Sequence, residues 1–107
     1  MVKLFIDNIR KPKTSGWKIV RSYKTAINFF KKHECPSIIS IDHDLGGDKT
    51  GYDIVKWLCE YDMDTNYLDD VMIVKIHSAN PVGKQNIRSY LENYSRFSGK
   101  KILISEV

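Results

Sequence analysis

The sequence contains few cysteines and no long hydrophobic run. Its two cysteines, Cys35 and Cys59, stand far apart and do not form a CxxC spacing, so we do not expect a disulfide. The apolar run in the N-terminal residues MVKLFID is too short for a signal-peptide core, and no later segment approaches the about 20 apolar residues that a membrane helix needs. We therefore expect a cytoplasmic protein that does not bind a membrane.

Long runs of one charge are also missing. Lys and Arg number 17 against 13 Asp and Glu, which makes the net charge +4. A positive field favours anionic partners, and we expect a small molecule of the nucleotide type. The adjacent basic residues form short pairs, such as Lys31-Lys32 and Lys100-Lys101, rather than a contiguous strip. Extended nucleic-acid binding is therefore not expected.

The chain length and the hydrophobic pattern predict one α/β domain over residues 1–107. Short apolar runs alternate with segments in which apolar residues recur at helical spacing. The predicted strands are residues 2–6, 17–21, 38–41, 71–76 and 101–105, the predicted helices begin at Ser22, Tyr52 and Val82 or Gly83, and residues 8–16 and 62–70 are predicted loops or turns. This alternation predicts a three-layer α/β fold with a mostly parallel sheet of five strands.

Ionisable side chains follow three of the predicted strands. Asp7 follows the first strand, the motif IDHDLGG places Asp42, His43 and Asp44 directly after the third, and His77 follows the fourth. The carboxyl ends of parallel strands meet at one edge of a sheet, and ligands of α/β proteins bind there. We therefore expect these side chains around one pocket of small-molecule size.

Two kinds of chemistry suit these residues. His43 and His77 have the residue type for a general base and a general acid that act on a phosphodiester, with Asp42 and Asp44 beside them. Alternatively, Asp7, Asp42 and Asp44 offer the hard oxygen ligands that Mg²⁺ or Mn²⁺ prefers. The residue pattern leaves both alternatives open.

Further residues near the strand ends are candidates for substrate binding. Arg10 follows the first strand and has the planar fork that clamps a phosphate. Thr50 precedes a predicted helix, where it can cap the helix or help to bind an anion. The candidate substrate-binding residues are Arg10, Asn8, Thr50, Ser78, Asn80 and Lys84. We expect Trp17, by contrast, to belong to the core.

Five segments resemble one known family. They are FIDNIRKP, GWKIVRSY, IISIDHDLG, TGYDIVKWL and IHSANPVGKQNI, and together they extend from about Leu4 to Leu91. Their order and spacing resemble the receiver-like family named for predicted cyclic-phosphate processing. The resemblance implies a compact receiver-like (flavodoxin-like) fold and a role for His43 and His77 in processing a cyclic nucleotide or another cyclic phosphate. The family commonly has an acidic pair after the first strand, whereas this chain has Asp7 and Asn8.

Three functional hypotheses remain. The first is a phosphodiesterase-like hydrolase of a cyclic nucleotide or a 2′,3′-cyclic phosphate, and the second is a module that binds a cyclic nucleotide without cleaving it. The third is a phosphorelay receiver, for which Asp7, Asp42 and Ser78 resemble the acidic residue, the phosphoacceptor and the switch hydroxyl. A phosphorelay receiver also needs a lysine at the end of the last strand, whereas Lys100 and Lys101 stand at its beginning.

Overall fold

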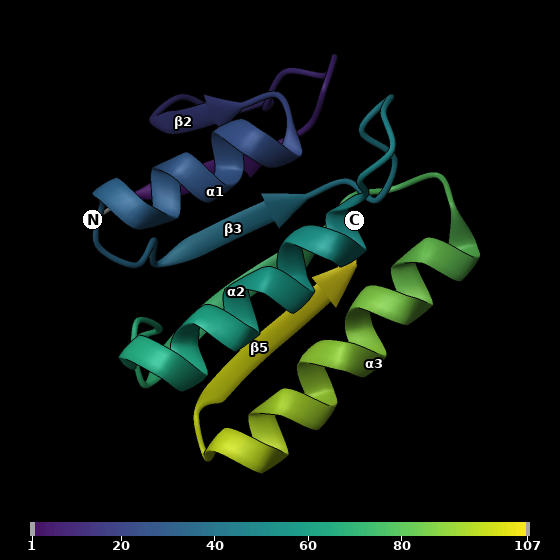
Figure 1. Cartoon of the computed structure of the whole chain (residues 1–107). Coiled ribbons are helices and arrows are strands. Elements are labelled where there is room, and N and C mark those ends of the chain that lie inside the picture. Colours follow the sequence, from purple (N-terminus) through teal and green to yellow (C-terminus); the bar gives the residue numbers. More distant parts are fainter. Residues whose placement is uncertain (1, 107) are drawn as a thin grey trace.

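The computed structural model describes residues 2–106 of the chain, in which strands and helices alternate as the sequence predicts. The elements in chain order are β1 (Lys3–Ile6), β2 (Trp17–Val20), α1 (Tyr23–Lys32), β3 (Ile38–Ile41), α2 (Gly51–Thr65), β4 (Val71–Ile76), α3 (Pro81–Ser98) and β5 (Lys101–Glu106). Figure 1 shows these elements from the side of the helices. The connection from β1 to β2 contains no helix.

The five strands form one parallel sheet in the order β2-β1-β3-β4-β5. Strands β1, β3 and β4 are therefore neighbours, which the site prediction requires. Their hydrogen bonds continue one residue past the strand ends, because the N–H of Asp42 donates to Ile6 and the N–H of His77 donates to Ile41. Asp7, Asp42 and His77 consequently stand side by side at the carboxyl edge of the sheet.

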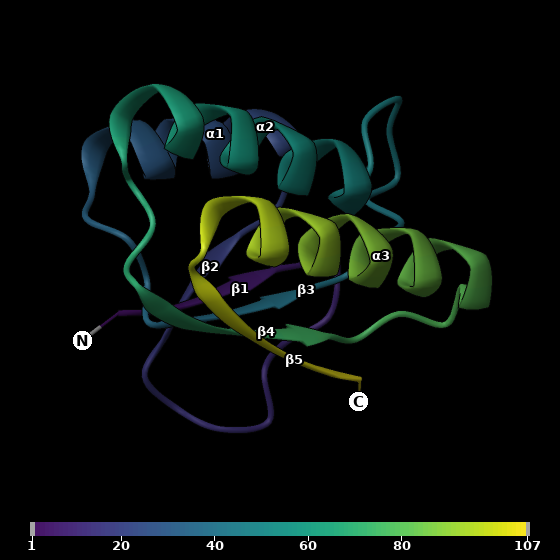
Figure 2. The ribbon, with the colours of Figure 1, turned by 90° about the horizontal axis from the view of Figure 1, so that it is seen from below.

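All three helices cover one face of the sheet, and the loop of residues 7–16 crosses the other face (Figure 2). Parallel strands are joined by right-handed crossovers. Three successive connections, from β2 to β3, from β3 to β4 and from β4 to β5, advance in one direction along the sheet. The helices in these connections therefore lie on the same side of the sheet. The connection from β1 to β2 runs in the reverse direction and lies on the opposite side. The domain is a receiver-like α/β fold in which a loop, rather than a helix, forms the third layer.

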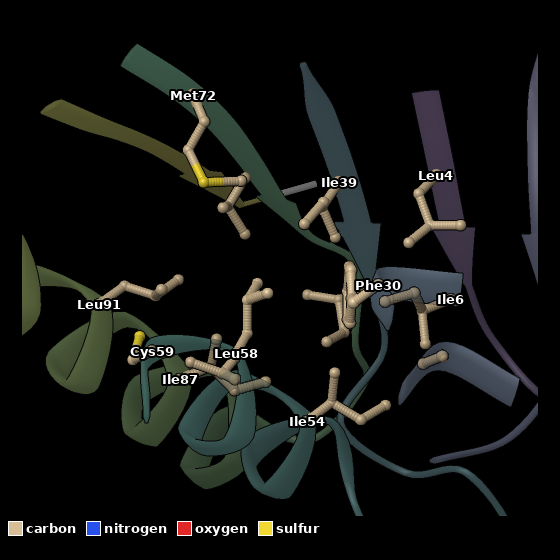
Figure 3. Close-up of a cluster of buried hydrophobic side chains, with 14 of the residues drawn as sticks. Leu4, Ile6, Phe30, Ile39, Ile54, Leu58, Cys59, Met72, Ile87 and Leu91 are labelled. Carbon is tan, nitrogen blue, oxygen red and sulfur yellow. The ribbon is translucent and has the colours of Figure 1, made fainter. Parts of the chain in front are cut away.

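The hydrophobic core lies between the helices and the sheet (Figure 3). Alternate strand residues such as Leu4, Ile6 and Ile39 face the helices and are nearly inaccessible to solvent. They meet apolar residues of the helices, among them Phe30 and Leu58. Successive side chains along a strand point to opposite faces of the sheet. The other residues of each strand therefore point to the helix-free face, where the loop of residues 7–16 lies.

Two element boundaries differ from the sequence prediction. The sequence predicts a loop or turn over residues 62–70, but α2 continues to Thr65 and ends at Asn66 in the left-handed conformation. The acidic residue Asp62 remains in the helix because its carboxylate is buried against Lys100 and Tyr94, which lie far away in the sequence. Helix α3 begins at Pro81, slightly earlier than predicted, because Asn80 accepts the cap hydrogen bond.

No helix in the described part of the chain has the length and apolar character needed to span a membrane.

Candidate functional site

His77, the first residue after β4, lies in a buried chain of hydrogen bonds. Its Nε2 is 3.0 Å from Oδ2 of Asp7, and its Nδ1 is 2.7 Å from Oγ of Ser40. The imidazole also stacks on the ring of Phe5, with 4.5 Å between the ring centroids and 8° between the planes. Residues of β1, β3 and their ends therefore fix the imidazole in one orientation.

The charge on Asp7 determines which nitrogen of His77 carries the proton. Burial by itself would raise the pKa of Asp7, but hydrogen bonds from the backbone of Arg10 and Ile9 and from His77 outweigh burial and lower it. An ionised carboxylate only accepts hydrogen bonds, so Nε2 of His77 donates to it. Burial lowers the pKa of His77, although Asp7 opposes this shift. The imidazole is therefore neutral at physiological pH, and its Nδ1 accepts a hydrogen bond from the Ser40 hydroxyl.

A cavity of about 390 Å³ opens beside this chain of hydrogen bonds, between the loop and the helix-free face of the sheet. Small-molecule sites commonly have volumes of about 300–1,000 Å³. The lining residues are Phe5, Trp17, Ser40, Lys75 and His77 from the sheet and Arg10, Lys11, Pro12, Lys13 and Thr14 from the loop. We call this cavity the loop cavity.

The lining of the loop cavity is positively charged. Arg10, Lys11, Lys13 and Lys75 line it, and no carboxylate is among its lining residues. Within the described residues none of the three lysines forms an ion pair, whereas Nε of Arg10 lies 3.8 Å from Oδ2 of Asp7. These charges favour an anionic ligand, and a phosphate group is the common biological anion that Arg and Lys bind.

Hydrogen bonds hold the loop that forms the outer wall of this cavity. The guanidinium of Arg21, directly after β2, donates to the carbonyl oxygens of Asp7 and Arg10, at 3.1 Å and 2.5 Å. The indole Nε1 of Trp17 donates to Oγ1 of Thr14 at 2.8 Å. Trp17, which we expected in the core, is half-buried and packs edge-on against Phe5. The loop cavity is thus a built feature of the fold.

His43 is directed toward the helices, away from the loop cavity. Its Nδ1 lies 2.9 Å from Oδ1 of Asp44. Its ring packs so closely against Gly83, in the first turn of α3, that a β-carbon at Gly83 would overlap the ring. His43 does not line the loop cavity, whereas His77 does. The structure therefore brings one of the two predicted histidines to the cavity and places the other near the start of α3.

The three carboxylates predicted to bind a metal each have hydrogen-bond partners within the chain. Asp7 is fully buried, and both of its oxygens already accept hydrogen bonds from the loop backbone and from His77. Asp42 accepts a hydrogen bond from the backbone of Asp44, whose own carboxylate bonds to His43. Across residues 2–106 no three His, Cys, Asp or Glu side chains are grouped to hold a metal ion. These hydrogen bonds occupy carboxylate oxygens that Mg²⁺ or Mn²⁺ would need as ligands, and metal binding stays a prediction.

The predicted substrate-binding residues are dispersed around the carboxyl edge. Arg10 lines the loop cavity. Asn8 directs its side-chain amide toward Gly46, whose left-handed backbone turns the chain after β3. Lys84 lies on α3, with its Nζ 3.6 Å from a carboxylate oxygen of Glu106. Of these three residues, only Arg10 is placed to contact a ligand in the cavity.

The other three predicted substrate-binding residues have structural partners. Thr50 and Asn80 are the N-caps of α2 and α3, and their side-chain oxygens accept hydrogen bonds from backbone N–H groups in the first turns. Oγ of Ser78 is 3.1 Å from the backbone nitrogen of Asn80 and accepts its hydrogen bond. These side chains shape the edge of the sheet, and any contact with a ligand stays a prediction.

The lysines near β5 lie away from the ionisable residues at the carboxyl edge. Lys100 precedes β5, and its Nζ is 2.6 Å from Oδ1 of Asp62 at the amino edge of the sheet. The carboxyl end of β5 carries Glu106, whose carboxylate pairs with Arg88 at 2.8 Å. The described strand β5 therefore has no lysine at the position that a phosphorelay site requires.

Sequence reasoning missed several residues that line the loop cavity. Ser40 and Lys75 are polar residues within the otherwise apolar strand segments IISI and VMIVKI, and that contrast is the signal that could have identified them. They lie side by side, because Ser40 pairs with Lys75 in the register of β3 and β4. Lys11 and Lys13 gave no such signal, since surface lysines are common in loops.

The family comparison covers the strands and the loop that form this site. Residues 2–93 match the model of the family described as the cyclic-phosphate processing receiver domain. No curated protein and no solved structure matches the sequence. The matched segment includes the loop cavity together with Asp7, His43 and His77. The chain is a member of the cyclic-phosphate processing receiver domain family.

Proposed function

We propose that this chain hydrolyses a cyclic phosphate, carried by a cyclic nucleotide or by a 2′,3′-cyclic phosphate end, in the loop cavity. The observation that carries the proposal is the cavity itself, which combines about 390 Å³ of space with four basic side chains and the imidazole of His77. Membership of the family supports a cyclic phosphate as the ligand class. Hydrolysis is the reaction for which a neutral, oriented imidazole is suited.

The charges around the cavity match the needs of this reaction. A cyclic phosphodiester carries one negative charge, and more negative charge develops on its oxygens as a nucleophile attacks the phosphorus. Arg10 and Lys75 stand on opposite walls of the cavity, one on the loop and one on the sheet. Fixed positive groups of this kind stabilise the developing charge more than they stabilise the bound substrate.

His77 acts as the proton carrier in this proposal. Its neutral imidazole takes a proton as the nucleophile attacks, and the imidazolium then returns the proton to the leaving oxygen. Asp7 holds the ring in the required tautomer and stabilises the imidazolium. His43 has no contact with this cavity in the described structure, so a mechanism that pairs both histidines is tested separately.

The first experiment is incubation of the purified protein with cyclic mono-, di- and oligonucleotides and with oligonucleotides that end in a 2′,3′-cyclic phosphate. Products are separated by chromatography, with and without EDTA. We expect cleavage of at least one ligand and a loss of about 10²- to 10⁴-fold in turnover for His77→Ala, the range typical of a removed general acid or base. The EDTA arm tests the metal prediction directly.

Two further variants show whether the loss of turnover in His77→Ala is specific to this histidine. His33→Ala is the matched control, because His33 is exposed at the end of α1 and does not line the cavity; it should retain full turnover. His43→Ala should lower turnover much less than His77→Ala. Equal losses for His43→Ala and His77→Ala, with circular dichroism unchanged, would favour the paired-histidine mechanism. Equal turnover for His77→Ala and the wild-type protein would contradict the proposal.

One observation favours a second function, the sequestration of a cyclic nucleotide without cleavage. Both ring nitrogens of His77 already have hydrogen-bond partners, so neither is free to contact a ligand directly. The lining of Arg10 and the three lysines binds an anion whether or not a bond breaks. Tight stoichiometric binding in calorimetry, with the ligand recovered unchanged, would identify the chain as a sequestering module.

A further inference from the structure

Both nitrogens of the His77 imidazole are occupied, and this limits how the residue can act. Nε2–H donates to Asp7, and the lone pair of Nδ1 faces Oγ of Ser40 at 2.7 Å. The stacking on Phe5 prevents the ring from turning freely. His77 can therefore move a proton to or from the cavity through the Ser40 hydroxyl, which is the next atom in the chain.

Ser40 stands where a reacting group is needed. It lies in β3 between Phe5 of β1 and Lys75 of β4, and all three residues line the loop cavity. Ser40 is the only polar residue of its strand, and its side chain points to the helix-free face. The carboxylate, the imidazole and the hydroxyl thus form a continuous chain from Asp7 to the cavity, with the order of groups that activates a serine in hydrolases.

We propose that Ser40 is a nucleophile activated by His77 and Asp7, and that it attacks phosphorus in the loop cavity. This proposal rests on the proposed function for its substrate class. As the Oγ–P bond forms, Nδ1 of His77 takes the hydroxyl proton. The P–O bond of the ring breaks, and its electron pair goes to the ring oxygen, which receives the proton from Nδ1. The product of this step is a phosphodiester between Ser40 and the opened substrate.

Water completes the cycle. Nδ1 of His77 takes a proton from the water as its oxygen attacks the phosphorus. The Oγ–P bond breaks, and Ser40 recovers the proton from Nδ1. One water molecule is consumed, and the cyclic phosphate becomes a phosphomonoester. Lys75 lies beside Ser40 in the register and supplies a fixed positive charge next to the reacting phosphate in both steps.

A fluorophosphonate probe tests the nucleophile independently of cyclic-phosphate turnover. The probe reports an activated serine, because the Oγ–P bond forms as fluoride leaves. We expect wild-type protein to be labelled at Ser40, as read by peptide mass spectrometry, and Ser40→Ala to be unlabelled. Labelling should fall at least tenfold in His77→Ala. Ser105 is an internal control, since it lies on the same face two strands away, is exposed and has no imidazole partner.

The outcomes separate this inference from the proposed function. Absence of label at Ser40, or equal label at Ser40 and Ser105, would overturn the role of Ser40 even if a cyclic phosphate is cleaved. Labelling of Ser40 that depends on His77, without cleavage of any ligand in the panel, would support the activated serine and contradict the hydrolysis. If a ligand is cleaved, acid quenching should trap the protein with one nucleotide on Ser40, and Ser40→Ala should lose that adduct together with turnover.

Discussion

The hydrogen bond between His77 and Asp7 joins residues that are 70 positions apart in the sequence. It ties the end of β4 to the end of β1 across β3, which lies between them in the sheet. Both side chains are buried, and Oδ2 of Asp7 and Nε2 of His77 are hydrogen-bond partners of each other. The pair therefore contributes to stability, and this contribution depends on pH.

The first prediction concerns acid stability. Burial lowers the folded-state pKa of His77 below 6.5, against the opposing effects of Asp7 and Asp42 and with a smaller lowering effect of Arg10. The unfolded state therefore binds more protons, and the free energy of unfolding should fall as pH decreases from 6.5 through the folded-state pKa. The stabilising ionisation of Asp7, whose pKa is lowered from 3.8, is lost only at more acidic pH. Urea unfolding over this range measures the slope.

His77→Gln removes the titrating group while leaving an amide that can still form hydrogen bonds. Its unfolding free energy should vary less with pH just below 6.5 than that of the wild-type protein. If the unfolding free energy had the same pH dependence in the two proteins, folding would not lower the pKa of His77. That result would remove the reason for treating His77 as neutral at physiological pH.

At the scale of elements, the start of α3 is packed against the end of β3. The contact is between Gly83 and the His43 ring, where a β-carbon has no room. Gly83 also donates its N–H to Asn80, the cap of the helix. The position of α3 over the carboxyl edge therefore depends on a glycine in its first turn.

The second prediction is that Gly83→Ala destabilises the protein. In an open helix, replacing Gly by Ala stabilises by about 0.5–1 kcal/mol, but overfilling a packed site costs about 1–3 kcal/mol. We expect the unfolding free energy to fall in the wild-type background. In the His43→Ala background, where the ring is gone, the same substitution should be neutral or stabilising. An equal cost in both backgrounds would show that His43 is not the obstacle.

At the scale of the whole molecule, the two edges of the sheet carry different groups of polar residues. The carboxyl edge carries the loop cavity, and the amino edge carries a buried ionic network around Asp62. The carboxylate oxygens of Asp62 accept hydrogen bonds from Lys100 at 2.6 Å, from the hydroxyl of Tyr94 at 2.5 Å and from the backbone of Leu68 at 2.7 Å. This network joins α2, α3 and the segment before β5.

The third prediction is that stability and ligand binding can be changed separately. Asp62→Ala leaves a mostly buried ammonium without its carboxylate, which should lower the free energy of unfolding by about 3 kcal/mol. Asp64→Ala, on the exposed side of the same helix, should have little effect. Affinity for a cyclic nucleotide, measured by calorimetry where both variants are folded, should equal that of the wild-type protein. A selective loss of affinity in Asp62→Ala would show that the two edges are coupled.

Much of the fold could be predicted because its signals are local. Apolar runs such as that of Ile38–Ile41 and cap residues such as Thr50 define strands and helix starts within a few positions. One of the two boundaries that differ, the continuation of α2 past Asp62, depends on Lys100 and Tyr94, which no local pattern could connect to that helix.

The sequence by itself determined the alternation of elements, the family and the edge of the sheet at which the ionisable residues gather, because these follow from local patterns and the direction of parallel strands. Only the tertiary structure decided which of these residues face one another. Strand register places Ser40 beside Lys75 and directs His77 toward Ser40 and Asp7, while His43 turns to the helices. The reversed connection from β1 to β2 puts a basic loop over that face. Register and the side of a crossover are properties of the assembled sheet, so no single segment contains them.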